Sequence, residues 1–91
     1  MYVHLGQDAF AVSDEIIGIF DMDTATVQKS TRDFLSEAEK KGEVINVSAY
    51  ELPKTFVLCK TKDGKRKIYI SPVSPATLQR RAGVRRTIYG K

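Results

Sequence analysis

Ninety-one residues, 42% of them hydrophobic and 29% charged, are typical of one small globular domain. No apolar run approaches the ~18–20 residues of a transmembrane helix, and the N-terminus lacks the basic and then apolar pattern of a secretion signal. A single cysteine, Cys59, cannot form an internal disulfide. We therefore expect a cytoplasmic protein.

The net charge of +4 conceals a strong asymmetry between the two parts of the chain. Residues 1–53 carry four basic and ten acidic side chains, for a net charge of −6. Residues 54–91 carry eleven basic side chains and one acidic side chain, for a net charge of +10. This division favours a polyanionic partner such as nucleic acid, or pairing between the acidic and basic parts of neighbouring copies. A charged surface that only keeps the chain soluble is the third interpretation.

Three short strands are predicted at the N-terminus. Apolar runs at residues 2–5 and 9–12 flank a glycine-containing turn, which predicts a hairpin. Residues 15–20 are apolar on both faces, so we expect this third strand to be central in its sheet.

The main helix is predicted after these strands, with Asp23 or Thr24 as its N-cap and Gly42 as its stop. A side-chain oxygen at the N-cap accepts hydrogen bonds from the free amides of the first turn. One apolar stripe runs along the expected helix and contains Val27, Phe34, Leu35 and Ala38.

Three more strands and a short helix are predicted in the second half. Residues 43–49 and 55–59 read as strands, and Asp63-Gly64 predicts the turn that leads into a strand at residues 66–71. Ser74 and Pro75 suit the N-cap and first position of a short helix that continues to Ala82.

Together these segments predict an α+β domain over residues 1–82, with a basic C-terminal tail over residues 83–91. The sheet is expected to be mixed or antiparallel, with about six short strands, one main helix and one short C-terminal helix.

Catalytic and metal chemistry find little support in the sequence. One histidine (His4) and one cysteine fall short of the ligands of a structural zinc site, and the six glycines are too scattered to form a phosphate-binding loop. Cys59, in the run Phe-Val-Leu-Cys, is expected to be a buried apolar residue rather than a nucleophile. We expect no metal, no cofactor, no small-molecule substrate and no enzymatic activity.

Two basic clusters are the most informative feature. One surrounds the expected hairpin turn, and the other lies on the short helix and the tail: Lys60, Lys62, Lys65, Arg66 and Lys67, then Arg80, Arg81, Arg85 and Arg86. Arginine and lysine bind phosphate, and each neutralised phosphate releases counterions. The clusters therefore favour contact with a nucleic-acid backbone, whereas no base-reading motif such as a helix-turn-helix or zinc finger is present.

Four segments stand out when taken together and in order: Tyr2-Val3-His4-Leu5-Gly6, Ile16-Ile17-Gly18-Ile19-Phe20-Asp21, Pro53-Lys54, and the run from Tyr69 to Arg81. In this order they resemble the bacterial extracellular-matrix (biofilm) regulatory proteins, whose branches are called RemA and RemB. The resemblance spans nearly all of residues 1–82, and the opening and the Ser-Pro-rich close are more similar to the RemB branch.

The resemblance implies a DNA-binding transcriptional regulator that acts as a ring-like or otherwise symmetric homo-oligomer. In the RemA branch, DNA contact is attributed to arginines, including an adjacent pair in the connection that here reads Tyr50-Glu51-Leu52-Pro53-Lys54. Glu15 stands near another such position, at the start of the third strand. If the chain binds DNA, either the basic hairpin and the C-terminal helix carry more of the contact, or only Lys54 persists from the family site.

We therefore expect double-stranded DNA and further copies of the chain as partners, without a membrane. The predicted phosphate contacts are Lys54, Lys65, Arg66, Lys67, Arg80, Arg81, Arg85 and Arg86. The alternative is an oligomeric scaffold or protein-interaction module that does not bind DNA, in which the acidic part of one copy meets the basic part of the next. RNA is a variant of the first hypothesis that these residues do not separate from DNA.

Overall fold

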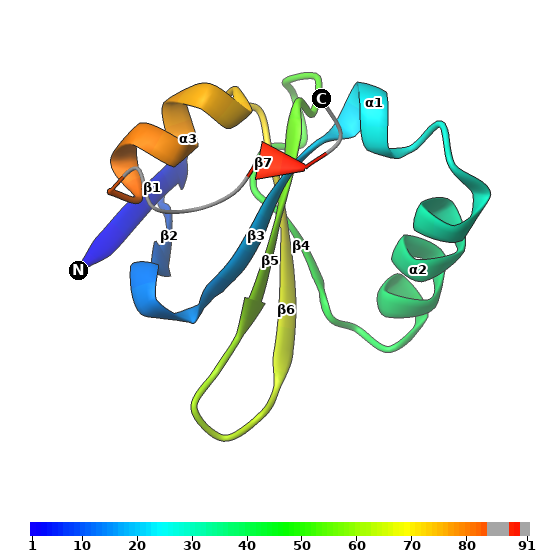
Figure 1. The fold of residues 1–91 in the computed structure, drawn as a ribbon, viewed down its shortest axis with the longest axis horizontal. Helices are drawn as coiled ribbons and strands as arrows, with labels where there is room; N and C mark the ends of the chain where they lie inside the picture. Colours follow the sequence, from blue (N-terminus) through cyan, green and yellow to red (C-terminus); the bar gives the residue numbers. More distant parts are fainter. Residues whose placement is uncertain (84–87, 90–91) are drawn as a thin grey trace.

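The computed structural model describes residues 1–83 and 88–89, and its α+β fold confirms the predicted class (Figure 1). Short strands and helices follow one another along the chain, with one turn of 3-10 helix at Ser13–Glu15. The strands in the described residues are β1 (Tyr2–Gly6), β2 (Ala9–Val12), β3 (Ile16–Asp21), β4 (Val44–Asn46), β5 (Thr55–Lys60), β6 (Arg66–Ser71) and β7 (Ile88–Tyr89). The α-helices there are α1 (Met22–Ala25), α2 (Lys29–Lys40) and α3 (Pro75–Arg81).

Strands β1 and β2 form the predicted antiparallel hairpin, as a separate two-stranded sheet. Side chains alternate along β1, so that Val3 and Leu5 are buried while Tyr2 and His4 face outward. The turn requires Gly6, which has a φ of +112°. A Cβ at this position would also lie 3.4 Å from the Pro72 ring.

The other strands form a mixed sheet in the order β4-β6-β5-β3-β7. β5 pairs antiparallel with both β3 and β6, whereas β4 runs parallel to β6 and β7 runs parallel to β3. As its two apolar faces predict, β3 has a neighbour on each side. Its pairing shifts between Ile16 and Gly18, and Ile17 at this irregularity is 52% exposed.

Apolar side chains pack on both faces of this sheet, in two clusters. The β1–β2 hairpin and α3 cover one face, where Leu5, Val57 and Leu78 are buried. The helix α2 covers the other face, where Ala38 packs with Phe56 and Ile68. Figure 1 shows α3 and the hairpin on one side of the sheet and α2 on the other.

The predicted N-cap of the main helix is wrong. The Asp21 carboxylate accepts hydrogen bonds from the amides of Asp23 and Thr24, at 2.9 and 3.2 Å, and so caps the separate turn α1. Asp21 holds this place because it ends β3 where α1 begins. The chain then turns before α2, whose N-cap is Gln28.

The break before α2 also corrects the predicted apolar stripe. The guanidinium of Arg32 donates from Nη1 to the carbonyl oxygens of Thr26 and Val27, at 2.9 and 2.8 Å, and so satisfies acceptors outside the helix ladder. Val27 lies in this connection and is 74% exposed. Phe34 and Leu35, in contrast, pack against the second cluster as expected.

The second half follows the prediction more closely. Gly64 has a φ of +84° in the turn between β5 and β6, and the Ser74 hydroxyl accepts from the Thr77 amide at 3.3 Å to cap α3. Strand β4 covers three residues of the predicted 43–49. β7, which was not predicted, falls within the expected tail, whereas Arg85 and Arg86 lie outside the described residues.

Candidate nucleic-acid interface

The turn between β5 and β6 is organised by Thr61. Its amide donates to the Lys65 carbonyl at 2.8 Å, and its hydroxyl accepts from the Lys65 amide at 3.1 Å. The same hydroxyl donates to the Asp63 carboxylate, and this bond is the main reason that the pKa of Asp63 lies below its ordinary value. The turn therefore has a defined shape, and its one acidic group is already bound within it.

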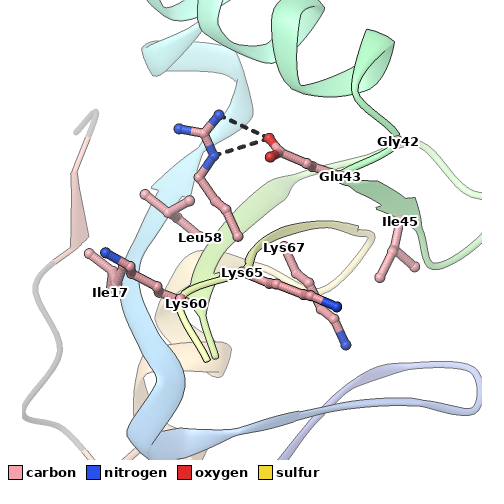
Figure 2. A pocket seen from close by; sticks show the side chains of 10 residues that line it. Ile17, Gly42, Glu43, Ile45, Leu58, Lys60, Lys65 and Lys67 are labelled. Carbon is pink, nitrogen blue, oxygen red and sulfur yellow. Dashed lines mark hydrogen bonds and ion pairs between the residues drawn. The ribbon is translucent and has the colours of Figure 1, made fainter. Parts of the chain in front are cut away.

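Four exposed lysines project from this hairpin, and we call them the hairpin lysines: Lys60, Lys62, Lys65 and Lys67. Three of them border an open groove of about 760 Å³, Lys62 being the exception. The apolar side chains of Ile17, Ile45 and Leu58 also line it. Figure 2 shows Lys60 beside Ile17, while Lys65 and Lys67 extend on the side of Ile45. The hairpin thus presents several cationic groups around one apolar groove.

Arg66 stands between these lysines in sequence, but its guanidinium is held by other groups. Nε and Nη2 both donate to Oε1 of Glu43, at 3.1 and 2.9 Å (Figure 2). The Arg66 Cζ atom also lies 4.9 Å from the centre of the Phe34 ring. These contacts join β6 to the middle of α2 and to the segment that follows this helix.

The predicted helix arginines lie on a different part of the molecule. Arg80 Nη2 donates to the Thr77 hydroxyl at 3.3 Å, and Arg81 Nη1 donates to the His4 carbonyl at 2.9 Å. Both side chains are exposed on α3, which packs with the β1–β2 hairpin (Figure 1). Arg80 and Arg81 therefore lie apart from the hairpin lysines in a single chain.

Lys54 occupies a third place. It is exposed, and its backbone bonds to Met22 and Ser71 where β5 begins. Lys60 ends the same strand, six residues later. At ~3.3 Å per residue, the two positions are roughly 20 Å apart along β5.

Sequence reasoning missed the contact that occupies Arg66 and the apolar lining of the groove. Glu43 is 23 residues from Arg66, and the parallel pairing of β4 with β6 brings them together. Ile17 lies where the pairing of β3 with β5 is irregular. Gly18, a glycine inside a strand, is the sequence feature that could have indicated this irregularity.

Other reactive residues do not assemble into a site in the described chain. Cys59 is buried, and burial is the main cause that raises its pKa to about 12. His4 makes a 2.7 Å hydrogen bond through Nε2 with the Gln7 carbonyl. Across residues 1–83 and 88–89, no three His, Cys, Asp or Glu side chains are grouped to hold a metal ion. Nor does any helix there have the length and apolar character to cross a membrane.

Comparison with known proteins confirms the resemblance seen in the sequence. The family model of the RemA-like proteins, described as extracellular matrix regulatory protein A-like, matches residues 2–82. The chain is also 34% identical over 82 residues to extracellular matrix regulatory protein B of Bacillus subtilis (strain 168), an alignment that covers 90% of each chain. The chain therefore belongs to the RemA-like family of extracellular matrix regulatory proteins.

Proposed function

We propose that this chain is a cytoplasmic, DNA-binding transcriptional regulator of the extracellular-matrix (biofilm) type that acts as a homo-oligomer. The observation that carries the proposal is the set of four exposed hairpin lysines around one turn. The name of the Bacillus subtilis relative, extracellular matrix regulatory protein B, supports the regulatory part.

The chemistry of the hairpin suits the phosphate backbone rather than base edges. Lysine carries a compact charge on a flexible stem, and each phosphate that it neutralises releases counterions. Asp63, the acid within the turn, is bound to Thr61, and Glu43 is bound to Arg66. Neither ion pair in the described residues contains a hairpin lysine, and Asp63 is one acid against four lysines, so the turn presents a net positive charge to a polyanion.

The predicted contacts take different roles in this proposal. Lys60, Lys62, Lys65 and Lys67 contact phosphates, while Arg66 positions the hairpin through Glu43 and Phe34. Arg80, Arg81 and Lys54 supply contacts from other faces. These faces are separate in one chain. An oligomer would hold several copies on the same DNA, so that the first contact raises the effective concentration of the others. Arg85 and Arg86 remain predictions from the sequence.

Fluorescence anisotropy with a labelled DNA duplex at low salt tests which cluster binds. The hairpin variant is Lys60→Gln/Lys62→Gln, and Arg80→Gln/Arg81→Gln removes the same charge from α3. Lys29→Gln serves as a control on α2, where Lys29 pairs with Asp33 at 2.8 Å. We expect the hairpin variant to lose the most affinity, the α3 variant to lose less, and the control to bind like the unmodified chain.

Two results would overturn this assignment. Equal affinity of the hairpin variant and the unmodified chain removes the hairpin from the interface. No binding of the unmodified chain at low salt, while it remains folded and assembled, removes the DNA role and favours the scaffold alternative.

A further inference from the structure

The strand β4 forms an uncovered edge of the five-stranded sheet. It pairs with β6 on one side, and no segment of the described chain pairs with the other side. The Glu43 carbonyl accepts from Ile68 and the Val47 amide donates to Ile70, each at 2.9 Å, so both residues face β6. Because backbone groups alternate along a strand, those of Val44 and Asn46 face the open side. Such groups are a template for another strand.

Hollows flank this edge on both faces of the sheet. One, of about 350 Å³, lies between β4, the β1–β2 turn and the segment around Tyr50. The other, of about 480 Å³, lies between β4 and the helices α1 and α2. Asn46 borders both. A strand added beside β4 would direct alternate side chains toward the two hollows, which suits strand addition.

Opposite charges lie beyond the two ends of β4. The N-terminal end of β4 comes directly after Glu43. There, Lys65 and Lys67 border the groove that Ile45 also lines (Figure 2). Past Asn46, Asp8 borders the smaller hollow, and Glu51 accepts from the Gln7 side chain at 3.3 Å.

Antiparallel pairing with an identical strand would place the acidic end of each copy against the lysine end of the other. The contact would also cover Tyr50, which is 97% exposed, and Ile45, which is 38% exposed. Charge, backbone and apolar surface are thus self-complementary about one two-fold axis.

We propose that a second copy of this chain occupies the β4 edge, with the two β4 strands antiparallel about Ile45. Val44 of each copy then exchanges hydrogen bonds with Asn46 of the other, and the two Ile45 residues form the close, non-hydrogen-bonded pair. The inference rests on the self-association in the proposed function and is independent of DNA binding.

Disulfide trapping tests this register directly. In a non-hydrogen-bonded antiparallel pair the Cα atoms are about 4.5 Å apart, within the range that a disulfide spans. We expect Ile45→Cys to form a covalent dimer rapidly under mild oxidation. Lys62→Cys, on the exposed hairpin turn away from the axis, is the control and should remain mostly monomeric in a denaturing gel. The native Cys59 is buried, so it should not contribute.

Sedimentation of Asn46→Pro gives the second test. Proline removes an amide that faces the open side, so the β4–β6 bonds persist while the added strand loses a donor. We expect the unmodified chain and Asn46→Ala to sediment at twice the 10.2 kDa chain mass or at a multiple of it. Asn46→Pro should shift toward the single chain, with circular dichroism showing that it is folded.

The outcomes separate this inference from the proposed function. A monomeric unmodified chain at micromolar concentration, or an assembly that survives Asn46→Pro without trapping through Ile45→Cys, overturns the β4 contact. A trapped dimer that binds no duplex at low salt supports the β4 contact and overturns the DNA role instead.

Discussion

The ion pair between Glu43 and Arg66 gives a prediction that links stability to binding. Glu43→Gln keeps the side-chain size and removes the charge that two Arg66 donors share. The two side chains are 23% and 34% exposed, so water screens the pair in part. We therefore expect a loss of about 0.5–1 kcal/mol in the free energy of unfolding. For a domain of this size that loss lowers Tm by about 2–8 °C.

Urea unfolding and DNA titration of two variants provide the assay. Arg66→Ala also loses the Phe34 contact, so its total loss should be about 1–2 kcal/mol, with an unchanged urea m-value. Glu43→Gln removes a negative charge beside the hairpin, while its amide oxygen can still accept from Arg66, so duplex affinity at low salt should rise. Unchanged unfolding midpoints in both variants, or a loss of duplex affinity in Glu43→Gln, would refute the reasoning.

Three further predictions concern the core, a helix cap and a buried thiol. Leu78→Ala empties a fully buried site and should cost about 2–5 kcal/mol in urea unfolding. Ser74→Ala removes the cap of α3 and should cost about 1 kcal/mol, with Ser30→Ala on the exposed surface of α2 as control. Cys59, with its pKa raised from 9.0 to about 12, stays protonated in the native state while the unfolded chain ionises. Stability should therefore fall as pH rises from about 9 toward 12, and Cys59→Ala should reduce that fall. An equal fall in both chains would show that Cys59 does not contribute.

Local signals predicted most of the strands and the final helix. The alternation of Val3 and Leu5 with outward residues, and the Asp63-Gly64 turn, are set by neighbours in sequence. The start of the main helix was less predictable because Asp21, Asp23 and Thr24 can each cap a helix by composition, whereas α2 begins after a break, with Gln28 as its N-cap. Only the end of β3 decides among them, and that boundary depends on pairing with β5.

The candidate site was predictable where it is local. The hairpin lysines are close in sequence and flank one turn, so their proximity follows from the β5–β6 pairing. The separation of Arg81 from the hairpin lysines depends on the packing of α3 against β1, which no local pattern encodes. The same holds for Glu43, whose pairing with Arg66 needs the parallel crossover from β4 to β6.

The salt dependence of duplex binding tests the central claim most directly. Anisotropy titrations of the unmodified chain and of Lys60→Gln/Lys62→Gln, across a series of salt concentrations, give the slope of log K against log salt for each. Phosphate contact by the hairpin predicts a steep negative slope for the unmodified chain. The slope of the variant should be less negative by about 1.8, from ~0.9 for each lost contact. A slope near zero for the unmodified chain, or the same slope for both chains, would contradict the account.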